Sequence, residues 1–136
     1  MEFDRPDVIA EVTAAFAAYE RALVADDVEA VLGFFADRAI RFGIADQQAG
    51  IEEQTRWRRA QGGLPPGRRL EDTTICGYGT STAIVTTLFG YPGSDVLGRQ
   101  SQTWVRLPVG WRIVHAHVSE PAGVSSGVRS PSGTRS

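Results

Sequence analysis

Two segments near the C-terminal end of the chain alternate in character at every second residue, and they constrain the fold more than any other feature. Residues 98–106 and 111–119 are separated only by the short link at 107–110, which ends in Pro-Val-Gly. Alternation of this kind on both sides of a short Gly-containing link predicts an antiparallel hairpin. The chain must therefore place a long two-stranded ribbon in a sheet.

The faces of this hairpin are chemically unequal. If Leu107 pairs with Gly110, then Gln102 lies opposite His115, and paired residues share a face. One face then carries amides, imidazoles and indoles, from Gln100, Gln102, Trp104, Trp111, Ile113, His115, His117 and Ser119. The other face carries Ser101, Thr103, Val105, Val114, Ala116 and Val118. We expect the first face to line a pocket and the second face to pack against another surface.

The size and charge of the chain favour one compact domain with a small-molecule partner. A chain of 136 residues can bury a core but is too short for two ordinary domains, so we expect a single domain over 1–120. The segment 121–136 is rich in Gly, Ser and Pro, which predicts a disordered tail. The net charge of −2 is spread along the chain, which argues against nucleic acid or an anionic membrane as partner. No secretory signal or apolar run of membrane length is visible, so a cytoplasmic protein is expected.

Several kinds of chemistry are excluded by the residue types. All 14 basic residues are arginine, so a lysine Schiff base is not available. The single cysteine, Cys76, cannot form an internal disulfide and is expected to be a buried structural thiol. His115 and His117 share a strand face, but no cysteine or acidic residue stands at ligand spacing beside them. We therefore predict no metal site and no cofactor.

The first part of the chain predicts three helices. Pro6 and Asp7 mark a helix start, and apolar side chains then recur at steps of three and four, at Ile9, Val12, Phe16, Tyr19 and Leu23. A second helix, capped by Asp26 or Asp27, has its apolar positions at Val28, Val31, Leu32 and Phe35. A third helix begins at Gly50, and its inward face is polar, with Gln54, Thr55, Arg58 and the neighbouring Trp57.

Strands are expected at 39–44, with Arg41 among apolar neighbours, and at 68–76 and 80–90, before the hairpin. Three helices followed by mainly antiparallel strands predict an α+β fold, with the helices laid on one face of a curved sheet. Such a sheet encloses a cavity beneath the helices and leaves its outer face uncovered. We expect a second copy of the chain to cover that face, which makes a homodimer.

Several blocks of the sequence resemble the HpxZ/AtzH-like family, namely residues 16–23, 40–43, 50–58, 98–106 and 110–119. The resemblance implies an NTF2-like (cystatin-like, SnoaL-type) cone fold. It also implies a role in the degradation of ureido carboxylates, and for the AtzH-like branch a metal-free decarboxylating amidohydrolase that converts 1,3-dicarboxyurea to allophanate. The family's catalytic tyrosine and arginine fall on Tyr19 and Arg41.

The chain departs from the family pattern near its first strand. Members commonly have Arg-Tyr-Gly-Val or Arg-Tyr-Gly-Ala followed by a glutamate, whereas this chain has Phe42 and Asp46 at the corresponding places. The preceding segment, 35–39, is about two residues shorter than usual and lacks the usual tryptophan. A changed loop at the cavity mouth bears on the substrate more than on the fold.

The residue types themselves support binding of a ureido acid. Guanidinium holds a carboxylate with two parallel hydrogen bonds, and Arg41 and Arg58 both lie on inward faces. Two arginines suit a dianion, and one suits a monoacid. The amides of Gln100 and Gln102 match the donors and acceptors of a ureido group. The remaining residues expected at the substrate are Trp104, His117 and Ser119.

In the predicted reaction, water attacks the carbonyl group, and Tyr19 and Arg41 stabilise the charge that develops. The released carbamate then loses CO₂ once its nitrogen is protonated. Two other functions remain open. The chain could be an accessory subunit that holds a ureido acid or docks on a larger amidohydrolase. It could also be a ketosteroid-isomerase-like enzyme, which needs a carboxylate base in an apolar pocket. The acids near the first strand, Asp37 and Asp46, are both expected in loops.

Overall fold

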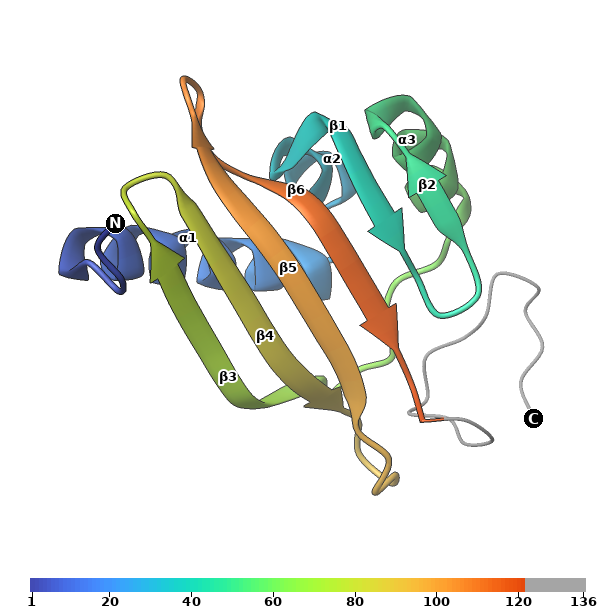
Figure 1. Cartoon of the computed structure of the whole chain (residues 1–136). Helices are drawn as coiled ribbons and strands as arrows, with labels where there is room; N and C mark the ends of the chain where they lie inside the picture. The colour runs from blue at the N-terminus through green and yellow to red at the C-terminus, as the bar shows by residue number, and fades with distance from the viewer. Residues whose placement is uncertain (122–136) are drawn as a thin grey trace.

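The computed structural model describes residues 1–121. Within this part of the chain, three helices lie against one face of a six-stranded sheet, which confirms the α+β architecture (Figure 1). Residues 122–136, to which the sequence assigns nearly all of the disordered tail, lie outside the described residues. No helix within residues 1–121 is long and apolar enough to cross a membrane.

The first helix, α1 (Pro6–Val24), is the long amphipathic helix that the sequence predicts. Its proline stands at the start of the helix, where the missing N–H is not needed. The buried stripe consists of Val8, Val12, Phe16, Tyr19 and Glu20. It begins at Val8, whereas Ile9 is only half-buried, so the stripe is rotated slightly from the predicted one. This rotation brings a carboxylate, that of Glu20, into the interior beside Tyr19.

Two short helices follow. In α2 (Val28–Gly33), the side chain of Asp27 caps the N-terminus by accepting the N–H of Ala30 over 3.2 Å. The helix is shorter than expected, because Phe35 pairs with Ile113 in the sheet and so belongs to a strand. The third helix, α3 (Ile51–Ala60), starts directly after Gly50, whose φ of 90° is a conformation that favours glycine.

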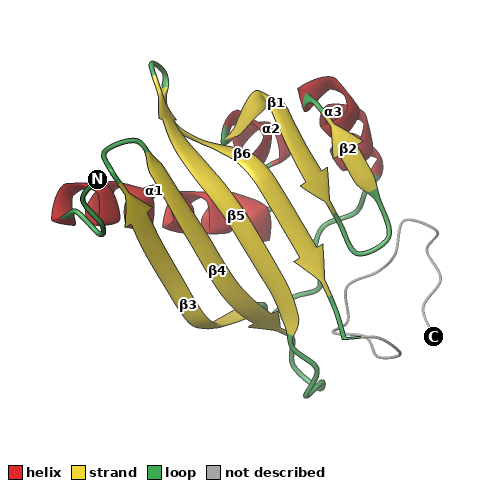
Figure 2. Ribbon diagram, in the orientation of Figure 1, coloured by secondary structure: helices red, strands yellow, loops and turns green. Residues whose placement is uncertain are grey.

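The six strands follow the order β2-β1-β6-β5-β4-β3 across the sheet (Figure 2). Only β1 and β6 pair in parallel, and all other neighbours are antiparallel. The first strand begins four residues before the predicted 39–44, and the three-residue β2 was not predicted because it is too short to show a pattern. The strands are β1 (Phe35–Phe42), β2 (Gln47–Ala49), β3 (Arg69–Tyr78), β4 (Thr82–Gly90), β5 (Gly98–Leu107) and β6 (Gly110–Ser119).

The hairpin of β5 and β6 forms as predicted, but its register changes part-way. Leu107 pairs with Gly110 and Trp104 with Ile113, whereas the next pair is Thr103 with His115. Val114 is therefore an extra residue on β6, a β-bulge. Because side chains alternate at period two, one extra residue moves every following side chain to the opposite face.

This bulge corrects the predicted faces of β6 beyond Val114. Gln102 pairs with Ala116 and Gln100 with Val118, so two small apolar side chains share the inner face with the amides. His115, His117 and Ser119 lie on the outer face, where His117 is exposed. The predicted pairing of Gln102 with His115 and of Gln100 with His117 is wrong.

The core lies between α1 and the inner face of the sheet. Trp104 and Ile113 are fully buried there, and the ring of Tyr19 meets the rings of Phe34, Phe35 and Trp104 edge-on, at centroid distances of 5.9, 6.0 and 6.4 Å. The other face of the sheet is not covered by any helix of the described chain, as Figure 1 shows. The contacts with the three aromatic rings fix the ring of Tyr19, so only its hydroxyl group is available for chemistry.

Candidate active site

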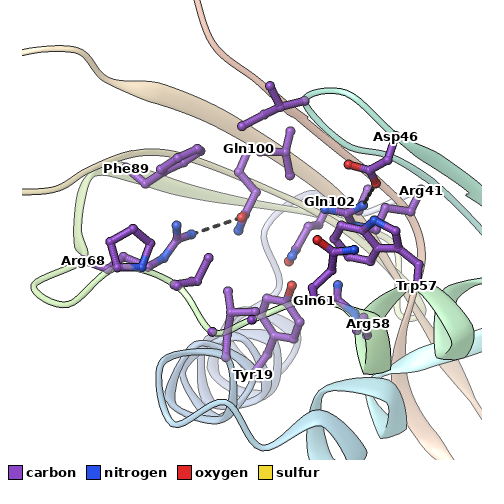
Figure 3. A pocket seen from close by; sticks show the side chains of 18 residues that line it. Tyr19, Arg41, Asp46, Trp57, Arg58, Gln61, Arg68, Phe89, Gln100 and Gln102 are labelled. Atoms are coloured by element: carbon purple, nitrogen blue, oxygen red, sulfur yellow. Dashed lines mark hydrogen bonds and ion pairs between the residues drawn. The ribbon is translucent and has the colours of Figure 1, made fainter. Parts of the chain in front are cut away.

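A cavity of about 330 Å³ opens between the inner face of the sheet, the C-terminal part of α1, α3 and the loop that follows α3. Its wall combines apolar side chains with arginines, amides, a tyrosine and a carboxylate, and Figure 3 shows how these side chains converge. The polar members of the wall are Tyr19, Arg41, Asp46, Arg58, Gln61, Arg68, Gln100 and Gln102. Of the eight residues that the sequence predicts for the site, Trp104, His117 and Ser119 do not line the cavity.

Tyr19 is held by its ring and presents its hydroxyl to the cavity. The side chain is 4% exposed, and three aromatic neighbours fix the ring. Its hydroxyl points toward the cavity and lies next to the guanidinium of Arg58 (Figure 3). A hydroxyl fixed in this way can donate a hydrogen bond to an acceptor placed between the two side chains.

Arg58 reaches the cavity from α3 and is positioned by the same helix. Its Nε donates to Oε1 of Gln54 over 2.7 Å, and Gln54, one turn earlier, is fully buried. The guanidinium carbon lies 5.3 Å from the ring centre of Phe35 and 5.4 Å from that of Trp57. No carboxylate of residues 1–121 lies within ion-pair distance of it. Burial lowers the pKa of Arg58, which is the cost of holding this charge away from water.

Arg41 also faces the cavity, but it is already paired. Its Nη1 lies 2.5 Å from Oδ1 of Asp46 and 3.0 Å from Oε1 of Gln48. Gln48 in turn donates from Nε2 to the same Asp46 oxygen over 2.8 Å, which closes a three-membered polar cluster. The guanidinium stacks 4.2 Å from the ring centre of Trp57. The sequence assigns Asp46 to a loop, and the structure shows that this loop residue turns inward and lines the cavity.

A second cluster, which the sequence analysis missed, lies at the other end of the cavity around Arg68. Its Nε and Nη2 donate to the two carboxylate oxygens of Glu20 over 3.0 and 3.3 Å, and its Nη1 donates to the hydroxyl of Tyr91 over 3.3 Å. Burial opposes the charge of Arg68, yet the hydrogen bonds and the charge of Glu20 raise its pKa above the usual value. Burial also raises the pKa of the Tyr91 hydroxyl. The sequence holds one signal for this cluster, because Glu20 lies four residues after Phe16 and so falls on the buried stripe of α1.

The two predicted amides play different parts. Gln100 belongs to the Arg68 cluster: its Oε1 accepts from Arg68 over 3.2 Å and its Nε2 donates to Glu20 over 3.2 Å. Gln102 accepts the indole N–H of Trp104 at its Oε1 over 2.9 Å. Because an indole nitrogen can only donate, this bond fixes the amide of Gln102 with its NH₂ group available as a donor.

The other predicted substrate contacts are not brought to the cavity. Trp104 is fully buried in the core and acts on the site through Gln102. His117 and Ser119 lie on the outer face of the sheet, because the bulge at Val114 reverses the direction of both side chains. The predicted placement of these two residues on the pocket face is therefore wrong.

Trp57 is a wall residue that the sequence analysis noted without a role. Its indole N–H is buried and has no acceptor among the described residues, and the same is true of Nε2 of Gln54. A buried donor without an acceptor costs free energy unless a ligand or water supplies one. Within residues 1–121, no three His, Cys, Asp or Glu side chains come together in a group that could hold a metal ion.

The family model described as AtzH-like matches residues 1–122. This chain belongs to the AtzH-like family. The match agrees with the resemblance found in the sequence, and it covers the helices, the sheet and every residue of the cavity wall. It suggests an amidohydrolase-type role.

Solved structures agree with this assignment. The AtzH-like chain is 45% identical to a cystatin-like fold protein from Burkholderia xenovorans LB400, with a TM-score of 0.84 over 88% of this chain and 96% of that one. It is 42% identical to a protein of the DUF3225 family from Pectobacterium atrosepticum SCRI1043, with a TM-score of 0.84 over 88% and 95% of the two chains. An NTF2-like protein from Pseudomonas putida KT2440 shares the fold at 18% identity and a TM-score of 0.74, over 87% and 89% of the chains. The predicted NTF2-like fold is thus confirmed. The comparison with curated proteins gives no match.

Proposed function

We propose that this AtzH-like protein is a metal-free decarboxylating amidohydrolase that acts on a small ureido carboxylate, of which 1,3-dicarboxyurea is one example. The observation that carries the proposal is the pair of Arg58 and Tyr19. A half-buried guanidinium without a carboxylate partner in the described chain lies next to a fixed tyrosine hydroxyl, inside a cavity of suitable size for such a ligand. The first group suits the carboxylate of the substrate, and the second suits the carbonyl group beside it.

In the proposed reaction, water adds to the ureido carbonyl carbon. The oxyanion that develops accepts hydrogen bonds from the hydroxyl of Tyr19 and from the NH₂ group of Gln102, and the positive charge of Arg41 stabilises it further. The C–N bond then breaks as the departing nitrogen takes one proton of the added water, which leaves a carbamic acid on the other nitrogen. The N–C bond of this acid breaks to release CO₂, and its nitrogen takes the second proton of the water. The donors that the cavity wall orients act on the addition step, where the oxyanion develops.

Asp46 is a positioning residue in this proposal. It accepts hydrogen bonds from Arg41 and Gln48 and so holds the guanidinium of Arg41 stacked on Trp57. The family resemblance places a glutamate where this chain has Asp46, whose side chain is one methylene shorter. We therefore expect Asp46 to set how far Arg41 extends toward the substrate.

The ketosteroid-isomerase-like alternative gains one feature and loses another. Asp46 supplies a carboxylate in the cavity, which the sequence analysis did not find there. That carboxylate is bound by two donors, however, and three arginines line the same cavity, so the pocket is not the apolar one that a steroid needs. Ureido-acid chemistry fits this wall better.

The test is release of CO₂ and ammonia from freshly prepared 1,3-dicarboxyurea, oxalurate and allophanate. Wild type should turn over at least one of them, and Tyr19→Phe should lower kcat at least about hundredfold, because one oxyanion donor is removed. Arg41→Ala should have a similar effect. The exposed residues Tyr78 and Arg59 provide matched controls, Tyr78→Phe and Arg59→Ala, which should behave as wild type.

Two outcomes would contradict the proposal. One is equal activity in wild type and Tyr19→Phe. The other is no turnover of any of the three compounds by wild type while one of them raises the melting temperature, which would favour the accessory or binding role.

A further inference from the structure

The charged groups of the cavity do not balance. Three guanidiniums reach its wall, from Arg41, Arg58 and Arg68, and two carboxylates lie against them, from Asp46 and Glu20. The charged groups that residues 1–121 place at this wall therefore sum to one net positive charge. Side chains of both ion pairs are at most about one-eighth exposed, so water screens this charge only weakly.

The carboxylates of the two ion pairs are already engaged by protein donors. Glu20 accepts three hydrogen bonds, two from Arg68 and one from Gln100. Asp46 accepts from Arg41 and from Gln48. A ligand carboxylate that took either arginine from its partner would leave a buried protein carboxylate uncompensated, and such a loss is strongly unfavourable. Among the cavity arginines, Arg58 alone has no carboxylate of residues 1–121 within ion-pair distance to give up.

Neutral donors also face a ligand near Arg58. They are the hydroxyl of Tyr19 and the NH₂ group of Gln102, and the amide of Gln61 lies beside them. Neutral donors suit carbonyl oxygens of an amide or a urea. They do not neutralise a second carboxylate.

We infer that the cavity selects singly charged acids, with the carboxylate of the ligand on Arg58 and an uncharged amide or ureido group against Tyr19 and Gln102. This inference rests on the proposed function, because it concerns the same cavity, and it narrows the substrate to monoanions. A dianion such as 1,3-dicarboxyurea is then a poorer ligand than a ureido acid with one carboxylate. The residue types alone are compatible with either a monoanion or a dianion.

An isosteric series of stable compounds tests the inference. Succinamide, succinamate and succinate have the same length and shape but carry zero, one and two negative charges near neutral pH. Calorimetric titration of the full chain at low, fixed ionic strength should give succinamate the lowest Kd, at least about tenfold below those of the other two. Binding of succinate as tightly as succinamate would overturn the inference, and so would failure of both succinamate and its shorter homologue malonamate to bind.

Charge variants make the test independent of shape. Glu20→Gln removes one negative charge from the cavity, so it should move the ratio of the two Kd values about tenfold toward succinate. Asp46→Asn makes the same change of charge at the other end and serves if the first variant does not fold. The control is Glu11→Gln on the same helix, where Glu11 pairs with Arg106 outside the cavity and the wild-type order should persist. Unchanged ratios in both cavity variants would overturn the inference.

Binding and turnover separate this inference from the proposed function. If the chain prefers succinamate but hydrolyses no ureido acid, the inference stands and the proposed function is wrong. If the chain hydrolyses 1,3-dicarboxyurea and prefers succinate, the proposed function stands and the inference is wrong.

Discussion

Trp104 donates its indole N–H to Oε1 of Gln102 over 2.9 Å, and the two side chains lie on the same inner face of β5. The bond turns an amide that could present either end into a donor toward the cavity. The Gln102 NH₂ group then faces the same space as the hydroxyl of Tyr19. A core tryptophan thereby sets the polarity of one wall of the proposed active site.

Gln102→Glu tests this polarity. The carboxylate can still accept from Trp104, but it replaces the NH₂ donor with a negatively charged oxygen. We expect the chain to fold and its affinity for a ureido or amide monocarboxylate to fall at least about tenfold. Calorimetric titration measures the change. Gln47→Glu, at an exposed position of β2, is the control and should bind as wild type. Tight binding by Gln102→Glu would show that Gln102 does not face the ligand.

Gly98→Ala should disturb the far wall of the cavity. A Cβ at position 98 would lie 2.1 Å from the ring of Phe89, which is buried and lines the cavity. The ring must shift, and overpacking of this kind costs about 1–3 kcal/mol. Denaturant unfolding should show that loss of stability. The matched control is Gly33→Ala at the end of α2, where a Cβ meets nothing within 4 Å. Equal stability of the two variants would contradict the close packing of the Phe89 ring against Gly98 of β5.

We propose that a second copy of the chain covers the outer face of the sheet. Phe42 and Ile40 are 40% and 46% exposed on this face, and the ring of Phe42 meets those of His115 and His117 at 5.7 and 5.6 Å. Sedimentation velocity should give wild type the mass of two chains and Phe42→Arg the mass of one. Val109→Arg changes an apolar residue at the exposed hairpin turn and should remain dimeric. A monomeric wild type would contradict the proposal.

Glu11 should make the stability of the fold depend on pH. Its carboxylate accepts the indole N–H of Trp111 over 2.8 Å and pairs with Arg106, and these contacts lower the pKa of Glu11 below its usual value of about 4.3. Because the folded-state pKa lies below the unfolded one, the stabilisation is present above the unfolded value and is lost as pH falls through the folded value.

Melting temperatures of wild type and Glu11→Gln across the acidic range check this pH dependence. The two proteins should differ at neutral pH and converge in acid. A difference that stays constant down to the lowest pH would mean that the charge of Glu11 does not contribute.

The sequence predicts those helices and strands whose buried side chains recur at a regular spacing. The periodicity of α1 fixes which way Tyr19 points, because a residue on the apolar side of a long helix must face the sheet. Arg58 follows in the same way from its spacing of four residues after Gln54. The hairpin is also predictable, since two alternating strands joined by a short link leave few other arrangements.

The features that the sequence did not predict depend on contacts between distant segments. The bulge at Val114 leaves no mark in a run where alternation continues on both sides, yet it moves His117 away from the cavity. The ion pair of Glu20 and Arg68 joins residues 48 positions apart, and Asp46 turns inward because Arg41 and Gln48 bind it. Polar partners inside a cavity are chosen by the folded structure and cannot be read from local patterns.

The most direct test of the proposed function is carbon NMR of a ureido monocarboxylate labelled with ¹³C at its ureido carbonyl, mixed with an equimolar amount of the protein. The account predicts that the signal of the labelled carbonyl declines and that labelled CO₂ and bicarbonate appear with wild type. Tyr19→Phe should leave the substrate signal unchanged over the same time. A labelled compound that saturates wild type and stays intact would contradict the account, because the ligand would then occupy the cavity without being hydrolysed.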